Sequence, residues 1–491
     1  MNKLKMHSPD LSQANIERIQ SLFPNCVTEV QGEDGELKLA VDFDLLKQEL
    51  SDSIVEGPQE RYNLNWPGKR NALLSANNPL VKTLRPCVER SIGFDSADNI
   101  FVEGDNLEAL KLLQETYLGQ VKLIYIDPPY NTGKDFIYAD DYSESIRDYG
   151  YKTNQLDNDN NRLVSNLSSN GRFHSDWLSM MYSRLKVAKR LLAEDGAIFI
   201  SIDDGEQGNL RQICDEIFGA KNFVNNIIWQ KKYSPQNDAK WFSDNHDFIL
   251  CYAKDKNVWR PNLLERSDKQ NAAYKNPDND IRGAWKATDL SVKTYSAAND
   301  YEITTPSGRV ISPPASRCWS VSKSKLQELI ADNRIWFGKD GNNVPSLKKF
   351  LTEVKAGITP LTIWTYQEVG HNQTAKQELK ELFPNTRDVF DTPKPVSLIE
   401  RIIDIATDKE SIVLDFFGGS ATTAHAVISK NQKDSGNRKF ILIQINEETG
   451  KDSFKYISDF SIDRIKRSIE KTSSSMGVRV LKVDTSNRDC N

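Results

Sequence analysis

The chain of 491 residues has few of the features that mark metal-binding, secreted or membrane proteins. Its six cysteines are far apart and form no Cys-x-x-Cys pair, and its five histidines are scattered. This argues against a disulfide framework and a zinc site. No apolar run reaches membrane-spanning length, and no signal-like segment opens the chain. We therefore expect a cytoplasmic protein with no bound metal.

Two nucleotide-binding patterns are also missing. The chain has neither the P-loop Gly-Lys-Ser/Thr pattern nor the full dinucleotide fingerprint. Its net charge of −5 gives no sign of a nucleic-acid partner. Residues 231–385, however, carry 23 Lys and Arg against 18 Asp and Glu, and six of the nine tryptophans. A mildly basic, aromatic-rich segment is compatible with a DNA-facing surface.

The most informative motif is Asp127-Pro128-Pro129-Tyr130, which follows the apolar run 123–126. Ligands in open α/β sheets lie at the carboxyl ends of such strands. Proline has no N–H, but its carbonyl still accepts a hydrogen bond. An acid, a rigid carbonyl and an aromatic ring together suit a planar ring held by its exocyclic amino group. The alternative is an ordinary Pro-Pro turn after a strand.

A second motif joins a strand at 412–414 to a glycine turn and a helix start at Thr422. Glycines let the backbone approach a ligand closely, and a helix N-terminus offers unpaired N–H groups. Asp415 beside Phe417 and the turn suits a cofactor with an amino acid portion. Structural glycines at a strand–helix turn are the alternative.

Hydrophobic periodicity predicts an α/β fold interrupted by an irregular insert. The βαβ unit around Asp127 implies a parallel sheet. Strands are expected at 100–102, 123–126, 197–202, 223–230, 412–414 and 440–445, and helices at 106–113, 176–192, 209–218, 396–406, 422–429 and 454–470. The same pattern divides the chain into an N-terminal accessory region (1–95), the first half of an α/β domain (96–230), the irregular insert (231–385), the second half of the α/β domain (386–475) and the start of a C-terminal region (476–491).

Together the two motifs resemble those of the amino-methyltransferases that use S-adenosylmethionine. The catalytic motif precedes the insert and the cofactor motif follows it, which resembles the β arrangement, a circularly permuted motif order. Longer stretches resemble the Mod subunits of type III restriction–modification systems: 104–110, 127–133, 173–177, 200–204, 285–290, 392–395 and 483–487. The resemblance implies that 96–230 and 386–475 form the two halves of a Rossmann-like methyltransferase sheet, and that 231–385 is an inserted α+β target recognition domain.

The resemblance also implies the site residues. The catalytic residues would be Asp127, Pro128, Pro129 and Tyr130, and the cofactor-binding residues Asp105, Asn106, Lys394, Pro395, Asp415, Phe417, Gly419, Ser420 and Gln444. Asp105 has an equally good reading as a plain helix N-cap. The chain departs from the family in Ala421, where a third glycine is usual, and in Gln444, where an acid for the cofactor ribose is common. It also stops at Asn491, earlier than its relatives.

The resemblance predicts methyl transfer to adenine N6 in duplex DNA, with the base flipped out of the helix. Asp at position 127 favours adenine N6 over cytosine N4, where Ser is frequent. The expected partners are duplex DNA, a second copy in a homodimer and a restriction (Res) helicase–nuclease subunit. Two alternatives stay open: a DNA-recognition subunit in which methylation is secondary, and amino methylation of protein or RNA.

Overall fold

The computed structural model contains two compact units. Unit 1 combines Met1–Asn262 with Leu361–Asn491, and unit 2 spans Leu263–Pro360. Ser486 and Asn487 of the predicted C-terminal stretch lie outside the described residues. The structure describes residues 11–23, 26–31, 37–43, 46, 64–133, 136–138, 163–165, 173–354, 357–386, 390, 392–451, 453–472 and 475–485.

Unit 1 is built on a ten-stranded sheet that draws its strands from both sides of unit 2 in the sequence. Its strands in spatial order are β18 (Ile363–Trp364), β9 (Phe223–Gln230), β10 (His246–Ala253), β8 (Leu192–Ile202), β5 (Val121–Ile126), β19 (Ile412–Asp415), β20 (Lys439–Gln444), β4 (Asn99–Glu103), β23 (Val478–Thr485) and β3 (Lys82–Pro86).

Strand directions place the two predicted motifs at one edge of the sheet. β5 pairs in parallel with β8 on one side and with β19 on the other. The predicted buried parallel strand before Asp127 is therefore confirmed. The sheet as a whole is mixed, because β10 runs antiparallel to β8 and β9, and β3 runs antiparallel to β23.

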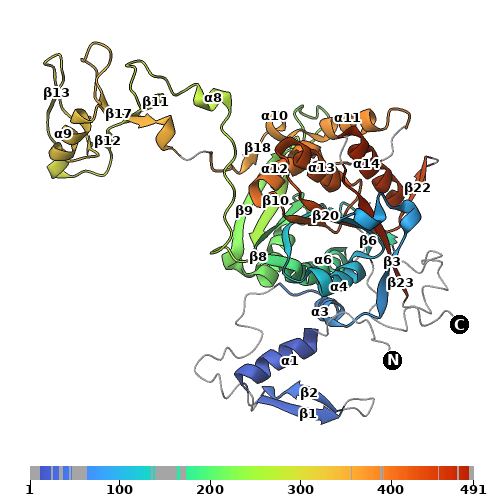
Figure 1. Cartoon of the computed structure of the whole chain (residues 1–491). Helices are drawn as coiled ribbons and strands as arrows, with labels where there is room; N and C mark the ends of the chain where they lie inside the picture. Colours follow the sequence, from blue (N-terminus) through green and yellow to red (C-terminus); the bar gives the residue numbers. More distant parts are fainter. Residues whose placement is uncertain are drawn as a thin grey trace. The chain divides into compact units, whose positions relative to one another are not determined.

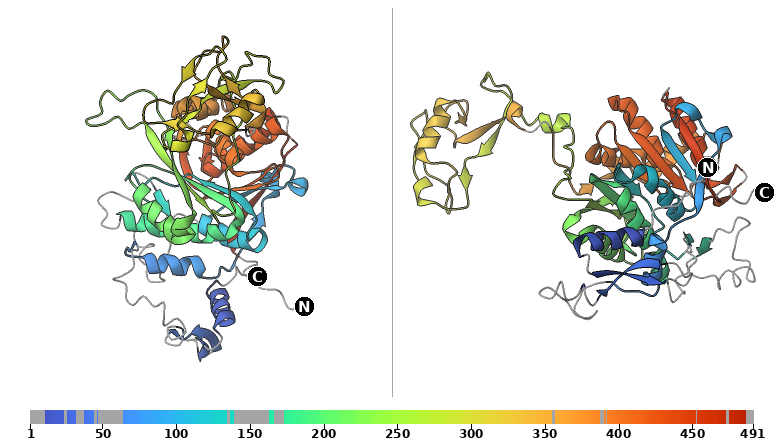
Figure 2. Two further views of the ribbon diagram at one scale, coloured as in Figure 1. Left: turned by 90° about the vertical axis from the view of Figure 1, so that its left-hand side faces the viewer. Right: turned by 60° about the horizontal axis from the view of Figure 1, so that its bottom comes forward.

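Helices cover both faces of this sheet and give three layers (Figure 1; Figure 2 shows the same layers from two other directions). Among the described helices, none combines the length and apolar character that a membrane span requires. On one face lie α3 (Lys69–Asn77), α4 (Asn106–Tyr117) and α6 (Phe173–Leu191), and on the other α12 (Val396–Ala406), α13 (Thr422–Asp434) and α14 (Ile457–Lys471).

The predicted strands and helices on either side of the insert are confirmed, with ends shifted by a few residues. Two strands within 231–385 nevertheless belong to the central sheet: the two-residue β18 and the longer β10. The apolar run 248–253 of β10 was visible in the sequence. Residues 231–262 and 361–385 belong to unit 1, so the compact inserted unit is shorter than the range assigned to target recognition.

Unit 2 has its own small sheet and core. Its central sheet consists of β11 (Trp285–Asp289), β17 (Ser346–Phe350) and β16 (Ile335–Trp336). Helix α9 (Lys323–Ala331) begins at Ser322, whose hydroxyl accepts a hydrogen bond from the Lys325 N–H. The core side chains are Leu290, Ile303, Ile311, Trp319, Leu326, Ile335 and Phe337.

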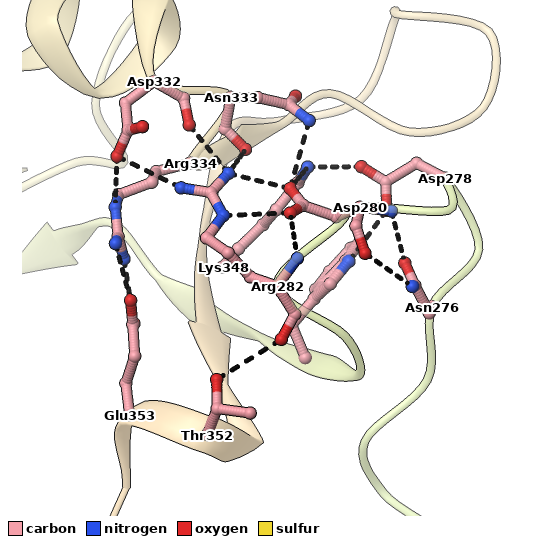
Figure 3. Close-up of polar contacts among 11 residues, drawn as sticks. Asn276, Asp278, Asp280, Arg282, Asp332, Asn333, Arg334, Lys348, Thr352 and Glu353 are labelled. Atoms are coloured by element: carbon pink, nitrogen blue, oxygen red, sulfur yellow. Dashed lines mark hydrogen bonds and ion pairs between the residues drawn. The ribbon is translucent and has the colours of Figure 1, made fainter.

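A network of charged side chains holds the strands of unit 2 together (Figure 3). Asp280, only 2% exposed, accepts two hydrogen bonds from the Arg282 guanidinium at 2.9 and 2.8 Å. These bonds hold the pKa of Asp280 well below its usual value. The fully buried Lys348 ammonium lies 3.5 Å from the same carboxylate and also contacts Asp278. It lies over the Trp285 ring, 5.2 Å from its centroid.

Removing Asp280 should therefore destabilise unit 2 strongly. Asp280→Ala removes the carboxylate shared by the buried Lys348 and the partly exposed Arg282, and the loss of one member of a buried ion pair costs about 3–5 kcal/mol. Hydrogen exchange of the β17 amides in the full chain measures this loss of stability. Glu328→Ala is the control, because the Lys325–Glu328 pair is 57% and 65% exposed, and such pairs contribute about 0–1 kcal/mol. Equal protection in the two variants would contradict this role.

Candidate functional site

The two predicted motifs meet because their strands are neighbours. In the β5–β19 pair, Leu123 lies opposite Val413 and Ile124 opposite Leu414. The carboxyl ends of these parallel strands therefore carry Asp127 and Asp415 to the same edge. A cavity of about 610 Å³ opens there. The predicted residues that line it are Asp127, Pro128, Pro129, Tyr130, Lys394, Asp415, Phe417, Gly419, Ser420 and Gln444.

Side chains of other elements hold the loop after β5 in place. The indole N–H of the fully buried Trp177 donates to the Pro129 carbonyl at 2.7 Å. Asn131 adopts a left-handed conformation with φ of 61°, which asparagine tolerates better than most residues. Its amide donates to the buried Glu206 carboxylate at 2.6 Å. The Pro128 carbonyl has no donor among the described residues, so it is available to a ligand.

Asp127 forms a close ion pair with Lys394. The Lys394 ammonium lies 2.7 and 2.6 Å from the two carboxylate oxygens. It also lies over the Tyr130 ring, 5.1 Å from the centroid, and over the Trp229 ring at 5.9 Å. The sequence predicted a cofactor role for Lys394, whereas the structure brings it to the predicted catalytic carboxylate.

A second carboxylate, Asp247 on β10, was missed by the sequence analysis. It is 3% exposed, accepts from the Tyr130 hydroxyl at 3.4 Å and pairs with the Lys231 ammonium at 2.6 Å. Burial raises the pKa of Asp247, and the charges of Lys394 and Lys231 oppose that rise. The available signal was the acid that opens the apolar run of β10, but its relevance depends on β10 lying beside β8.

The glycine turn after β19 places a buried acid against the cavity. Asp415 accepts from the Thr423 hydroxyl at 2.6 Å and from the Phe417 N–H at 3.0 Å. Burial is the largest cause that raises the pKa of Asp415 to about 7, and the Asp127 charge adds to it. A carboxyl group with this pKa is poised to ionise when a cation enters the cavity.

Two further side chains brace this turn. The Gln444 side-chain oxygen accepts from the Gly419 N–H at 2.7 Å, so this predicted cofactor residue also supports the turn. Gly419 has φ of 48°, a region that favours glycine. The buried Arg464 donates to the Ser420 hydroxyl at 3.0 Å and to the Thr422 hydroxyl at 2.9 Å. Arg464 was not predicted, because nothing in its local sequence points to the turn.

Residues 121–455 match the family described as DNA methylase. The chain is 37% identical to the type III restriction–modification enzyme StyLTI Mod subunit of Salmonella typhimurium, over 93% of this chain and 71% of that protein. It is 35% identical to the EcoPI Mod subunit of Escherichia phage P1, over 84% and 68%. The chain belongs to the DNA methylase family, among the type III Mod subunits.

A solved structure of the PvuII DNA methyltransferase (cytosine-N4-specific) aligns with this DNA methylase at a TM-score of 0.37 and 12% identity, over 79% of this chain and 97% of that one.

Three predicted cofactor residues of this DNA methylase do not line the cavity: Asp105, Asn106 and Pro395. Asp105 caps α4 by accepting from the Glu108 N–H at 3.1 Å, as its alternative reading proposed. Asn106 donates to the Phe416 carbonyl at 2.8 Å. The buried Arg184 binds both Asp105 and Asn106. These contacts connect the end of β4 to the glycine turn after β19, so both side chains support that turn from outside the cavity.

The raised pKa of Asp415 makes the stability of this DNA methylase depend on pH. A folded pKa of about 7 against an ordinary 3.8 means that folding favours the protonated group. Stability should therefore fall as pH rises from about 4 to about 7, by up to about 4 kcal/mol. Asp415→Asn should abolish this fall.

Urea denaturation of the wild type and the variant across this pH range measures the difference. Asp98→Asn is the control, because the Asp98 side chain is 63% exposed. Equal pH slopes in the wild type and Asp415→Asn would contradict the assignment.

Proposed function

We propose that the chain transfers a methyl group from S-adenosylmethionine to N6 of an adenine flipped out of duplex DNA. One observation carries this proposal: the Asp127–Tyr130 loop and the Asp415–Ser420 turn face one cavity of about 610 Å³. The first group of residues suits an exocyclic amino group, and the second suits a cofactor with an amino acid portion.

The residues of the turn fit this cofactor. The Asp415 carboxyl group, ionised in the presence of a cation, balances its positive charge, and Phe417 offers an apolar wall. Ser420 can offer its backbone N–H to a carboxylate, and Gly419, whose own N–H is bound to Gln444, lets the backbone come close to it. Glu447 also lines the cavity, and its carboxyl oxygens can accept hydrogen bonds from sugar hydroxyls. When bound, S-adenosylmethionine supplies the methyl group that is transferred.

The loop after β5 would hold the target base. Tyr130 offers a ring for stacking, which contributes roughly 1–3 kcal/mol per base. The Asp127 carboxylate and the Pro128 carbonyl would accept hydrogen bonds from the two N–H groups of the amino group. A carboxylate offers about four acceptor positions, so the Lys394 pair leaves room for this bond. Both hydrogen bonds would turn the nitrogen lone pair toward the methyl donor. As the N–C bond forms and the methyl–sulfur bond breaks, Asp127 would take the proton that the nitrogen releases.

The ion pairs around Asp127 would keep this geometry fixed before the base arrives. Lys394 holds Asp127, and Lys231 holds Asp247, which in turn accepts from Tyr130. Groups positioned in advance need little rearrangement during the reaction, and this contributes much of the acceleration in such sites.

We propose that unit 2 carries the target recognition function. It is inserted between the two halves of the sheet in sequence and folds around its own core. It carries 15 Lys and Arg against 11 Asp and Glu. By analogy with relatives named as subunits of type III enzymes, we further propose a restriction (Res) subunit as partner. Assembly as a homodimer stays a prediction.

The methylation test uses Asp127→Asn, which keeps the size of the side chain but removes its charge. We expect at least about a 100-fold loss of kcat, as for other groups that stabilise developing charge, with DNA binding retained. Asp204→Asn is the control, because Asp204 is exposed in the turn after the neighbouring strand β8. Its rate should match the wild type. Full activity of Asp127→Asn would overturn the assignment.

Product analysis separates the remaining candidates. Nucleosides from plasmid DNA incubated with the protein and cofactor should contain N6-methyladenine. N4-methylcytosine would instead support the cytosine alternative. Methyl transfer only to RNA or protein offered in the same assay would overturn the DNA proposal, and DNA binding with no transfer would support the recognition-subunit alternative.

A further inference from the structure

A second hollow of about 410 Å³ adjoins the catalytic cavity, and the proposed reaction does not use it. Residues that line both spaces form the common border, and the others line only the second hollow. The border residues are Lys231, Lys232, Asn372, Thr392 and Pro393, and the rest of the lining is Tyr233, Ser234, His371, Gln373 and Lys376.

The two spaces differ in charge. The catalytic cavity is lined by five carboxyl groups, from Asp127, Asp203, Asp247, Asp415 and Glu447, and by three lysines. The second hollow has three lysines and no carboxyl group. One space therefore disfavours an anion that the other attracts.

Two of the three lysines in the second hollow form no ion pair with a described residue. Lys231 is paired with Asp247 at 2.6 Å and with Asp244 at 3.5 Å. Within the part of the chain that the structure describes, Lys232 and Lys376 form no ion pair. Lys376 is exposed, and Lys232 is half-buried.

We propose that this hollow binds a backbone phosphate of the DNA strand next to the target nucleotide. The proposal rests on the proposed function, in which the target base enters the catalytic cavity. A neutral base can enter a space lined by acids, but its phosphates stay outside. Lys232 and Lys376 then attract the phosphate, and the Asn372 and Gln373 amides can donate to its oxygens.

The walls of the hollow are joined in the free protein. β9 has the same direction as β5, since both are linked through β10 and β8, so the segment after Gln230 begins at the cavity edge. The Asn372 N–H donates to the Lys231 carbonyl at 3.0 Å. The rings of Tyr233 and Tyr366 lie 5.5 Å apart. A phosphate would therefore meet a site that is already formed.

The rest of the same loop also favours a nucleic acid. Trp241 and Phe242, between β9 and β10, are 83% and 96% exposed. The Lys240 ammonium lies over the Trp241 ring, 5.5 Å from its centroid. Exposed aromatic rings interleaved with lysines are typical of surfaces that bind nucleic-acid strands.

The salt dependence of DNA binding tests the phosphate contact. Each phosphate neutralised in duplex DNA contributes about 0.9 to the slope of log Kd against log salt. Lys232→Gln and Lys376→Gln in the full chain should each lower this slope by part of that amount, and the double variant by about 0.9 in total. The control is Lys221→Gln, because Lys221 is exposed and lies just before β9, at the opposite end of that strand.

A second measurement identifies the phosphate. Target duplexes carry a single uncharged methylphosphonate at successive positions. In the wild type, a methylphosphonate at one position beside the target base should weaken binding. In the double variant, the methylphosphonate at that position should have no effect, while those at other positions act as in the wild type. Unchanged salt slopes, or an equal slope loss in Lys221→Gln, would overturn the inference.

Failure of this inference can be told apart from failure of the proposed function. If the wild type methylates adenine in duplex DNA while the lysine variants keep its slope, only the phosphate site is wrong. If the wild type neither binds nor methylates duplex DNA, the proposed function fails, and this inference with it. Thermal unfolding midpoints equal to the wild type show that a lost slope does not reflect unfolding.

Discussion

The pairing of β5 with β19 is the contact on which the rest of the site depends. The side chains that face each other across this pair, Leu123, Ile124, Val413 and Leu414, are fully buried. Burial of each contributes roughly 1.5–3 kcal/mol. Because the two strands are parallel, their carboxyl ends coincide, and Asp127 and Asp415 face one cavity although an inserted unit separates them in sequence. The split chain therefore forms one site.

The charged side chains that unit 1 buries near the paired strands lie around the cavity, beside the residues proposed to act on the base and the cofactor. Lys394 binds Asp127, Lys231 binds Asp247, and Arg464 holds the turn around Ser420. Such groups cost free energy to desolvate, and good geometry only offsets that cost. Their value lies in position: each fixes a side chain or a loop that faces the cavity. In the arrangement that we propose, acids line the cavity that takes the target base, and the two lysines of the adjoining hollow that have no ion pair among the described residues face the DNA strand.

Much of this could be predicted from local sequence. An apolar strand that ends in Asp127-Pro128-Pro129-Tyr130, and another that ends at Asp415 before a glycine turn, are patterns within a dozen residues. The partners of these residues could not be predicted in the same way. Asp247 and Arg464 reach the site only through strand order and helix packing. The apolar run of β10 lies in a segment whose weak periodicity predicted an irregular insert, so its place in the central sheet was not expected. For Asp105 the local sequence supported both a cofactor role and a helix cap, and the structure shows the cap.

The most direct test of the account is a crystal structure of the full chain with S-adenosylhomocysteine. The account predicts that the amino acid portion of this molecule lies against the Asp415–Ser420 turn. Its sulfur atom should face the Asp127–Tyr130 loop across the shared cavity. A molecule bound elsewhere, or one whose sulfur atom points away from Asp127, would contradict the claim that the two motifs form a single active site.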